Sequence, residues 1–342
     1  MPRSTPIPSA SPLVSVVTPA YNAAPYLAAC IESVLGQSFA DIEMLVVDDG
    51  STDRTSEVLT AFAARDARVR GFRGPNRGVS HARNVALRHA RGRFVALLDA
   101  DDEWDPLFLE EQLAIVRRHP DVAIVTGNAL NAGGGTIDGQ PVRPWPAQPR
   151  ELRFIDLIEH EDAMFIMSLV RREVFEAVGG FNEGLERSED YELWLRAAAV
   201  DLRIVTNPKP LGRYRRRHDS ATADQMALFE SLLRVLDRAR TFRERPRAAE
   251  LAAIDRQRHR LHASSLLLKG KQALLRGQFV EARSHFRELH HLGKGERFRL
   301  VASALQLAPT AVRALYRFRL WLLQRRVPVD RRAVPGIEVP AT

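Results

Sequence analysis

The 342-residue chain is 45% hydrophobic and 27% charged, which excludes an intrinsically disordered protein. Its single cysteine, Cys30, excludes an intramolecular disulfide framework and fits a reducing compartment. No apolar run reaches the roughly 18 residues of a membrane-spanning helix. Residues 1–12 lack the apolar core of a signal peptide and predict a flexible N-terminus.

The charge is divided unevenly along the chain. Residues 224–342 contain 24 Lys and Arg against 11 Asp and Glu, whereas residues 1–223 contain 26 against 31. A basic half can face nucleic acid, an anionic membrane surface or an acidic partner, and it can also be an ordinary solvated helical face. No nucleic-acid-binding motif is recognised, so no nucleic-acid partner is expected.

The front half alternates strand and helix patterns. The predicted strands are residues 13–20, 42–50, 68–72, 93–99 and 122–128, and the predicted helices are the segment opened by Pro25 and residues 52–65, 78–90, 106–118 and 188–200. A further strand followed by a helix is predicted within residues 164–181. Strands separated by helices of this length predict an α/β domain with a mostly parallel sheet flanked by helices.

The back half has no strand pattern. After the Gly- and Pro-rich segment 131–150, which predicts a surface loop, the front domain continues to residue 222, and residues 223–342 predict an all-helical C-terminal extension. Within it, residues 274–289 have the spacing of one tetratricopeptide-like hairpin. Residues 301–326 predict one last helix, which either lies on a membrane surface or packs on the domain.

Carboxylates crowd the end of one predicted strand, in the segment "RFVALLDADDEWDP". Ligands of open parallel sheets bind beyond the carboxyl ends of the strands. Asp99 and Asp101, spaced i and i+2, point to the same side there, and Mg²⁺ or Mn²⁺ prefers such oxygen ligands. Acidic residues that favour the dipole of the next helix are the alternative, which accounts for Asp102 to Asp105 better than for the earlier pair.

A second acidic strand end, "DDGSTD", contains Asp48 and Asp49. A carboxylate there can accept hydrogen bonds from a base or ribose. The alternative is a turn in which Ser51 or Thr52 caps the following helix.

Five segments in order, "VSVVTPAYNAAPYLAACIESVLGQSF", "IEMLVVDDGSTDRT", "NRGVSHARNVAL", "GRFVALLDADDEW" and "SEDYELWLRAA", resemble family 2 glycosyltransferases. The resemblance covers about residues 13–222, and the helical extension lies outside it. It implies a GT-A-type fold and inverting transfer of a sugar from a nucleotide donor. UDP is the donor nucleotide that it implies, with GDP and dTDP left open.

On the donor side, the resemblance implies that Pro19, Tyr21 and Asp49 line the base and ribose pocket, with Asp48 nearby. A core aromatic is the alternative for Tyr21. Arg83 and Asn84 lie where the family's "ARN" segment approaches the donor, and surface positions on a helix are their alternative.

On the metal side, Asp99 and Asp101 match the family's DxD motif, in which Asp99 faces ribose and metal and Asp101 ligates the metal. The ion would be Mn²⁺ or Mg²⁺. The segment "RYRRRHDSAT" resembles the loop that closes the family's catalytic domain, where His218 or Arg216 can reach metal or pyrophosphate. It is one residue shorter than expected, and a solvated basic loop is the alternative.

For the acceptor, Asp190 matches the general base that removes the proton of the attacking hydroxyl, with Glu189 beside it. Capping of the following helix is the alternative. Trp194 follows one helical turn later, where it either stacks on a sugar or belongs to the core.

Three other protein classes are alternatives to this family. The segment "TPAYNAAP" after the first strand contains neither the glycine fingerprint of a Rossmann dehydrogenase nor the Gly-rich basic loop of a nucleotidyltransferase. A non-catalytic interaction protein that uses the basic helical tail remains the alternative. We expect a metal-dependent glycosyltransferase acting on a glycan or lipid-linked acceptor in cell-surface polysaccharide or glycolipid synthesis. It would be cytoplasmic, with peripheral binding to the inner face of the membrane left open.

Overall fold

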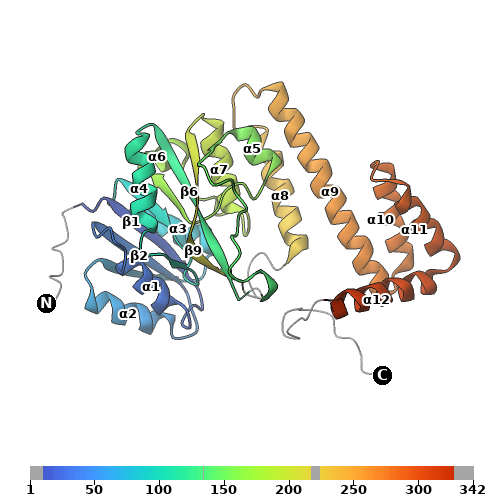
Figure 1. The fold of residues 1–342 in the computed structure, drawn as a ribbon, viewed down its shortest axis with the longest axis horizontal. Helices are drawn as coiled ribbons and strands as arrows, with labels where there is room; N and C mark the ends of the chain where they lie inside the picture. The colour runs from blue at the N-terminus through green and yellow to red at the C-terminus, as the bar shows by residue number, and fades with distance from the viewer. Residues whose placement is uncertain (1–10, 134, 217–223, 327–342) are drawn as a thin grey trace.

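A nine-stranded sheet lies in the N-terminal part of the chain, at the left in Figure 1. The structure is a computed structural model that describes residues 11–133, 135–216 and 224–326. The strands are β1 Val14–Ala20, β2 Ile42–Asp49, β3 Val69–Gly74, β4 Phe94–Leu97, β5 Glu103–Trp104, β6 Val122–Ala132, β7 Glu151–Leu152, β8 Ser168–Arg171 and β9 Arg203–Arg215. Their order in the sheet is β3-β2-β1-β4-β8-β6-β9-β5, with β7 paired to β9.

The helices of the front part lie between these strands, and those of the back follow one another directly. They are α1 Leu27–Leu35, α2 Thr55–Arg65, α3 Val79–His89, α4 Phe108–Arg118, η1 Gly135–Ile137, α5 Phe154–Glu159, α6 Arg172–Val178, α7 Glu189–Ala199, α8 Gln225–Ala239, α9 Ala248–Arg276, α10 Phe279–His291, α11 Glu296–Leu307 and α12 Pro309–Arg326. The predicted α/β architecture with a helical extension is therefore confirmed.

The first four strands form the parallel half of the sheet, in the order β3-β2-β1-β4. Strand β8 is antiparallel to both β4 and β6, so the sheet as a whole is mixed. Both β1, "VSVVTPA", and β2, "IEMLVVDD", are buried almost throughout. Near-continuous apolar runs are typical of parallel strands that are covered on both faces, which is why these strands were recognisable from the sequence.

The structure differs from the prediction in its later elements. Residues 301–326 form two helices, α11 and α12, because Pro309 lacks the N–H that a continuous helix would need and instead takes the first position of a new one. Strand β6 runs to Ala132, inside the segment predicted as a loop. The longest strand, β9, was not predicted, since "RIVTNPKPLGRYR" interrupts its apolar run with prolines and charges.

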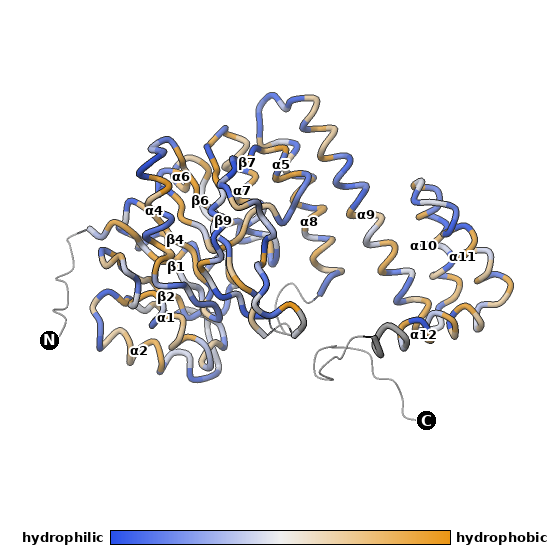
Figure 2. Tube along the Cα trace, viewed as in Figure 1, coloured by the Kyte–Doolittle hydropathy of each residue, from blue (hydrophilic) through white to orange (hydrophobic). Residues whose placement is uncertain are grey.

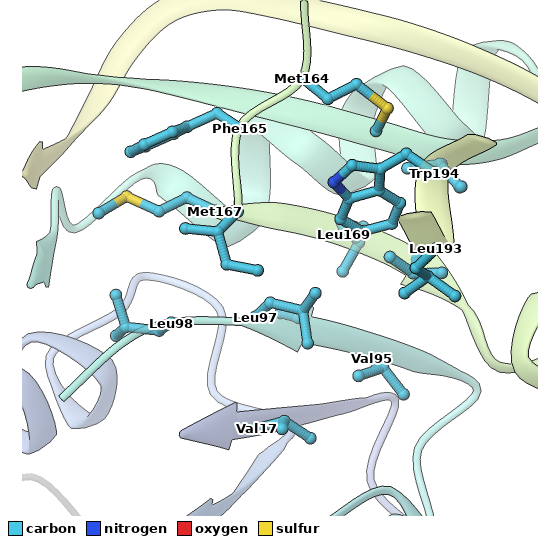
Figure 3. Packing of buried hydrophobic residues seen from close by; sticks show 14 of the residues in the cluster. Val17, Val95, Leu97, Leu98, Met164, Phe165, Met167, Leu169, Leu193 and Trp194 are labelled. Carbon is cyan, nitrogen blue, oxygen red and sulfur yellow. The ribbon is translucent and has the colours of Figure 1, made fainter. Parts of the chain in front are cut away.

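Side chains from several elements pack around Trp194 in the core (Figure 3). Its side chain is only 2% exposed, and Met164 and Leu169 lie beside it in this core. Burial assigns Trp194 to the core, so of the two alternatives stacking on a sugar is excluded.

Two separate hydrophobic cores divide the chain. The first contains the sheet and extends into α8 and the first half of α9. The second is formed by the rest of α9 with α10 and α11, and Val312 and Tyr316 of α12 pack against it. Hydrophobic residues run along the sheet strands, whereas α9 to α12 alternate hydrophobic and hydrophilic positions (Figure 2). Residues 223–342 as a separate domain, with one tetratricopeptide-like hairpin, stay a prediction.

Helix α9 ends in a glycine that the sequence pattern singled out. Gly277 has a φ of 82°, in the left-handed region that closes helices, and α10 begins two residues later at Phe279. Ala282 and Phe286 of α10 are buried in the second core. Among the described residues, no helix is long and apolar enough to cross a membrane.

Candidate active site

The strand ends of the parallel half meet at one edge of the sheet. Ala20 of β1 lies opposite Asp48 of β2, and Val17 of β1 lies opposite Leu97 of β4. Because the three strands run in the same direction, the residues that follow them lie close together beyond their carboxyl ends. Ligands of such sheets bind at this kind of edge.

The loops after β1 and β2 are tied together by hydrogen bonds. The backbone N–H of Asn22 donates to Ser51 Oγ (2.9 Å), and the backbone N–H of Thr52 donates to Asn22 Oδ1 (2.9 Å). Between these fixed loops Tyr21 is 49% exposed, which excludes the core-aromatic alternative. Pro19, near the end of β1, is half-buried. An exposed ring on a rigid loop is available to stack on a flat ligand.

Asp48 and Asp49 are buried and shape the neighbouring turns. Asp48 Oδ1 accepts from the backbone N–H of Ser51 (2.9 Å), and its Oδ2 lies 3.5 Å from Arg73 Nε. The two oxygens of Asp49 accept from the backbone N–H groups of Arg77 (2.9 Å) and Gly78 (2.8 Å), just before α3. The turn alternative for this segment is thus partly right. However, α2 begins at Thr55 without a side-chain cap, so neither Ser51 nor Thr52 has the capping role.

Position 50, between these carboxylates and the next loop, has no room for a side chain and requires glycine. Its φ is 75°, and an added Cβ would lie 2.6 Å from the backbone nitrogen of Asn76. We expect Gly50→Ala to lower the free energy of unfolding by about 1–3 kcal/mol, because both the conformation and the backbone contact oppose a side chain.

Denaturant unfolding checks this expectation, with Gly74→Ala as the matched control. An added Cβ at Gly74 has no neighbour within 4 Å, so its substitution should change stability by less than about 0.5 kcal/mol. Equal effects of the two substitutions would contradict the steric argument.

The turn after β4 concentrates negative charge. Asp102 is 1% exposed; its Oδ1 accepts from the backbone N–H of Arg215 (2.8 Å), and its Oδ2 is buried without a hydrogen bond. Burial first, and then the negative charges of Asp101 and Asp99, raise the pKa of Asp102 well above its ordinary value. The hydrogen bond from Arg215 and its positive charge oppose this rise.

Arg215, at the end of β9, holds this turn in place. Its Nε donates to the backbone oxygen of Asp101 (3.0 Å), and its guanidinium pairs with Glu103 (2.9 Å). The same guanidinium lies 4.9 Å from the ring centre of Tyr26. Sequence reasoning missed this residue, because "RYRRR" offers several arginines and the unpredicted strand β9 decides which one faces the turn.

Arg83 joins the strand end at Asp99 to Glu189, the residue beside the predicted base Asp190. It is 3% exposed and donates to Asp99 Oδ1 (2.7 Å) and to Glu189 Oε1 (2.5 Å). A surface position is therefore excluded for Arg83. Asn84, its neighbour on α3, exchanges hydrogen bonds with the backbone of Phe181 in both directions (2.8 Å each). The amide of Asn84 thus anchors the segment before α7, and its contact with the donor stays a prediction.

Asp190 lies in the first turn of α7, beside Glu189. The cap position is taken by Ser188, which has a φ of 59°, so Asp190 itself is not the cap. Burial raises the pKa of Asp190; the positive charges of Arg83 and Arg143 oppose the rise, and the negative charge of Asp99 adds to it. A carboxylate with a raised pKa in such surroundings is a candidate general base.

Arg143 is a second residue that sequence reasoning missed. Its side chain is largely buried, 3.8 Å from Asp162 and 5.8 Å from the ring centre of Phe165, and its charge acts on Asp190. No motif identified it, because it lies in the Gly- and Pro-rich segment where spacing carries no information.

Two residues predicted near the metal or pyrophosphate differ in what the structure describes. Arg216 donates to Asn131 Oδ1 (2.8 Å) and lies 4.8 Å from the ring centre of Tyr214, so its guanidinium already has partners. His218 lies outside the described residues, and its role as a metal ligand stays a prediction.

The described residues contain no group of three or more His, Cys, Asp or Glu side chains that could hold a metal ion. Asp99 and Asp101 provide two carboxylates, and Mg²⁺ or Mn²⁺ bound with phosphates commonly takes one or two from the protein. The negative charges of Asp101 and Asp99, which add to the effect of burial on the pKa of Asp102, are what a cation at this turn would offset. The donor set therefore fits such an ion when a diphosphate supplies further oxygens.

A pocket of about 290 Å³ lies away from these residues. It is lined by residues of α4, β7 and β9, among them Arg203, and by His119 directly after α4. None of the predicted site residues lines it, and the strand-end cluster remains the candidate site.

Comparisons with known proteins identify the family and the fold. A sequence profile of glycosyl transferase family 2 matches residues 15–179. TuaG of Bacillus subtilis, named a putative teichuronic acid biosynthesis glycosyltransferase, is 32% identical over 215 residues, which cover 63% of this chain and 83% of TuaG. The chain belongs to glycosyltransferase family 2. The profile ends before Asp190, so the assignment of the base rests on the geometry around α7.

Other matches extend the family likeness unevenly. The chondroitin synthase of Pasteurella multocida is 34% identical over 191 residues, which cover 55% of this chain and only 19% of the synthase. The chain thus spans about a fifth of that relative. Among solved structures, S. aureus TarS 1–349 in complex with UDP-GlcNAc matches with a TM-score of 0.62 at 19% identity, covering 89% of this chain and 91% of that one. The likeness to TarS supports the GT-A-type fold.

Proposed function

We propose that this family 2 member transfers a sugar from a nucleoside diphosphate donor to a hydroxyl group, with inversion at the anomeric carbon. The observation that carries the proposal is the buried bridge of Arg83 between Asp99 and Glu189. It joins the strand ends where a nucleotide would bind to the helix that carries the candidate base, so the two halves of a transfer site form one connected cluster.

The donor would bind at the edge formed by the loops after β1 and β2. Tyr21 and Pro19 offer apolar surface to the base, while Asp48 and Asp49 are the carboxylates nearest to a ribose. The UDP-GlcNAc bound to TarS favours UDP as the nucleotide. The donor sugar is not part of the proposal.

Asp99 and Asp101 would hold a divalent cation, Mn²⁺ or Mg²⁺, together with the donor diphosphate. When bound, such an ion stabilises the negative charge that develops on the leaving diphosphate. Arg83 forms a salt bridge with Asp99, so this carboxylate has a fixed orientation before any ligand binds.

The transfer step needs one base. Asp190 accepts the proton of the acceptor hydroxyl while the hydroxyl oxygen forms a bond to the anomeric carbon. The bond from that carbon to the diphosphate oxygen breaks, and the nucleoside diphosphate leaves with the electron pair. Attack on the face opposite the leaving group inverts the configuration. The raised pKa of Asp190 makes the ionised carboxylate a better proton acceptor than an ordinary aspartate.

For the acceptor, we propose a glycan or lipid-linked sugar of cell-surface polysaccharide synthesis, reached from the inner face of the membrane. The names of the teichuronic acid and chondroitin relatives support a polysaccharide product. The alternative is a non-catalytic interaction protein that uses the basic helical tail. The buried acidic cluster favours the enzyme, because burying carboxylates costs stability that an interaction protein has no reason to bear.

Release of nucleoside diphosphate from a panel of UDP-, GDP- and dTDP-sugars, with and without Mn²⁺, tests the proposal. We expect slow hydrolysis of one donor class even without an acceptor, and faster release when acceptor sugars are added. If no donor is turned over under any of these conditions while the protein is folded, the interaction protein is the better account.

A further inference from the structure

Helix α12 carries large apolar side chains that lie outside the second core. Leu315 is 76% exposed, Phe318 57% and Trp321 44%. These residues recur at i, i+3 and i+6, so they lie along one face of α12, and the rings of Phe318 and Trp321 stack with centres 5.6 Å apart. Ala311 and Ala314 are exposed on the same side of the helix.

The opposite face of the helix is already occupied. Val312 and Tyr316 pack against the second core, so packing within the chain accounts for that side alone. Helix α12 therefore has two apolar faces, one buried and one exposed. A contiguous exposed patch with large aromatic residues marks an interaction surface more often than chance.

Positive charge borders the exposed face on both sides. Arg317 and Arg319 are exposed next to Phe318, and α12 contains five arginines and no acidic residue. A second copy docking by this same face would bring these arginines against their equivalents, which like-charge repulsion opposes. An anionic surface is attracted instead.

The apolar face of α12 and the arginines beside it together indicate a membrane surface as the partner. Trp, Phe and Leu on one face with Arg beside them are typical of helices that lie in the plane of a membrane interface. Helix α12 has 18 residues, and none of the described helices qualifies as a membrane span, so the surface fits lying on a bilayer.

We propose that the α12 face of Leu315, Phe318 and Trp321 docks the chain on an anionic lipid bilayer. The apolar side chains enter the boundary between headgroups and acyl chains, and Arg317 and Arg319 pair with lipid phosphates. The docking surface stands on its own geometry. Its use, to bring the active site to a membrane-borne acceptor, rests on the proposed function.

Flotation of the full chain with vesicles tests the docking. We expect binding to vesicles of phosphatidylcholine with phosphatidylglycerol at low salt, and much weaker binding to phosphatidylcholine alone. The double substitution Leu315→Ser with Phe318→Ser should lower the affinity at least about tenfold. Arg317→Gln with Arg319→Gln should lower it by about tenfold or more, and only on the anionic vesicles.

Matched controls distinguish binding by this face from non-specific hydrophobic binding to vesicles. Val280 on α10 is 87% exposed and Leu300 on α11 is 64% exposed, so Val280→Ser and Leu300→Ser remove comparable apolar surface elsewhere. Both controls should bind like the wild type. Circular dichroism and size-exclusion chromatography of every variant check that the fold and the oligomeric state are unchanged.

Several results would overturn the proposal. One is the absence of binding to anionic vesicles at low salt, and another is unchanged binding of the Leu315 and Phe318 variant. A change of oligomeric state in that variant, with vesicle binding intact, would assign the face to self-association. Preferential binding of single-stranded RNA through the same residues would assign it to nucleic acid.

Donor turnover distinguishes this proposal from the proposed function. The α12 variants should release nucleoside diphosphate from a soluble donor at the wild-type rate, because they lie outside the active site. If the wild type binds vesicles but turns over no donor, the docking surface stands and the proposed function fails.

Discussion

Replacing Asp190 by Asn is expected to lower kcat for sugar transfer by about 10²- to 10⁴-fold, the usual contribution of a general base. Asn keeps the size of the side chain and an oxygen for the 2.7 Å hydrogen bond from the backbone N–H of Tyr191, so the helix start should remain intact. The measurement is steady-state release of nucleoside diphosphate with a hydroxyl acceptor. Glu186→Gln, an exposed acid of the preceding loop, is the matched control and should be close to wild type.

The stability of the Asp190→Asn variant gives a second, opposite readout. Burial raises the pKa of Asp190, so the ionised form is disfavoured in the folded protein. The free energy of unfolding therefore falls as the pH rises from the ordinary pKa of an aspartate to the raised value in the fold, and the cost persists at higher pH. At neutral pH the variant should be as stable as the wild type or more stable. A large loss of both stability and activity would indicate a structural role instead.

The pH dependence of kcat/KM follows from the same pKa. The base must be ionised to accept a proton, so kcat/KM should rise with pH through the pKa of Asp190, at a pH above that of an ordinary aspartate. The charges that set this position are Arg83 and Arg143, which lower the pKa, and Asp99, which raises it. A profile that is flat on the acid side from pH 4 upward would argue against the half-buried carboxylate of Asp190 as the base.

Removing the bridge of Arg83 should have the other large effect. Arg83→Gln leaves Asp99 and Glu189 without their shared cation, and loss of one partner from a buried ion pair costs about 3–5 kcal/mol. Without Arg83 the carboxylates of Asp99 and Glu189 should move from their positions, and this displacement should also lower kcat/KM about 10²-fold. Denaturant unfolding and steady-state kinetics measure the two effects.

Arg83→Lys keeps the test usable if the Gln variant does not fold. Lysine retains the charge, but one ammonium group cannot reproduce the forked contact with both carboxylates, so its activity should fall between those of the wild type and the Gln variant. Because the charge of Arg83 lowers the pKa of Asp190, the Gln variant should also shift the acid limb of kcat/KM to higher pH. Arg77 is an exposed arginine before α3, and Arg77→Gln should change neither the free energy of unfolding nor kcat/KM.

The donor half of the site was predictable because its residues lie at or next to the ends of strands that the sequence itself indicates. Strands β1 and β2 are near-continuous apolar runs. Asp48 and Asp49 end β2 and Asp99 follows β4 by two residues, and the ends of these strands must meet in a parallel sheet. Sequence neighbours thus carry spatial information there. For the same reason Asp101 could be assigned to the acidic turn without knowledge of the rest of the fold.

The other half depends on contacts between distant segments. Strand β9 brings Arg215 to the acidic turn after β4, and Arg143 reaches the surroundings of Asp190 from an irregular segment. No spacing along the chain encodes such meetings. The division of residues 301–326 into two helices was in principle predictable, since Pro309 lies inside the pattern, but the apolar residues on both sides of it favoured one continuous helix.

Nucleotide-dependent stabilisation against heat tests the central claim most directly. The experiment compares UDP, GDP, dTDP and CMP, each with and without Mn²⁺, on the wild type, on Asp101→Asn and on the control Asp105→Asn. A nucleotide at 100 times its Kd adds about 2.7 kcal/mol of stability, a Tm shift of about 4 °C for a chain of this size. The account predicts a Mn²⁺-dependent shift with one nucleoside diphosphate, retained in Asp105→Asn and lost in Asp101→Asn. No shift with any nucleotide, or a shift that Asp101→Asn leaves unchanged, would contradict a metal-assisted nucleotide site at these strand ends.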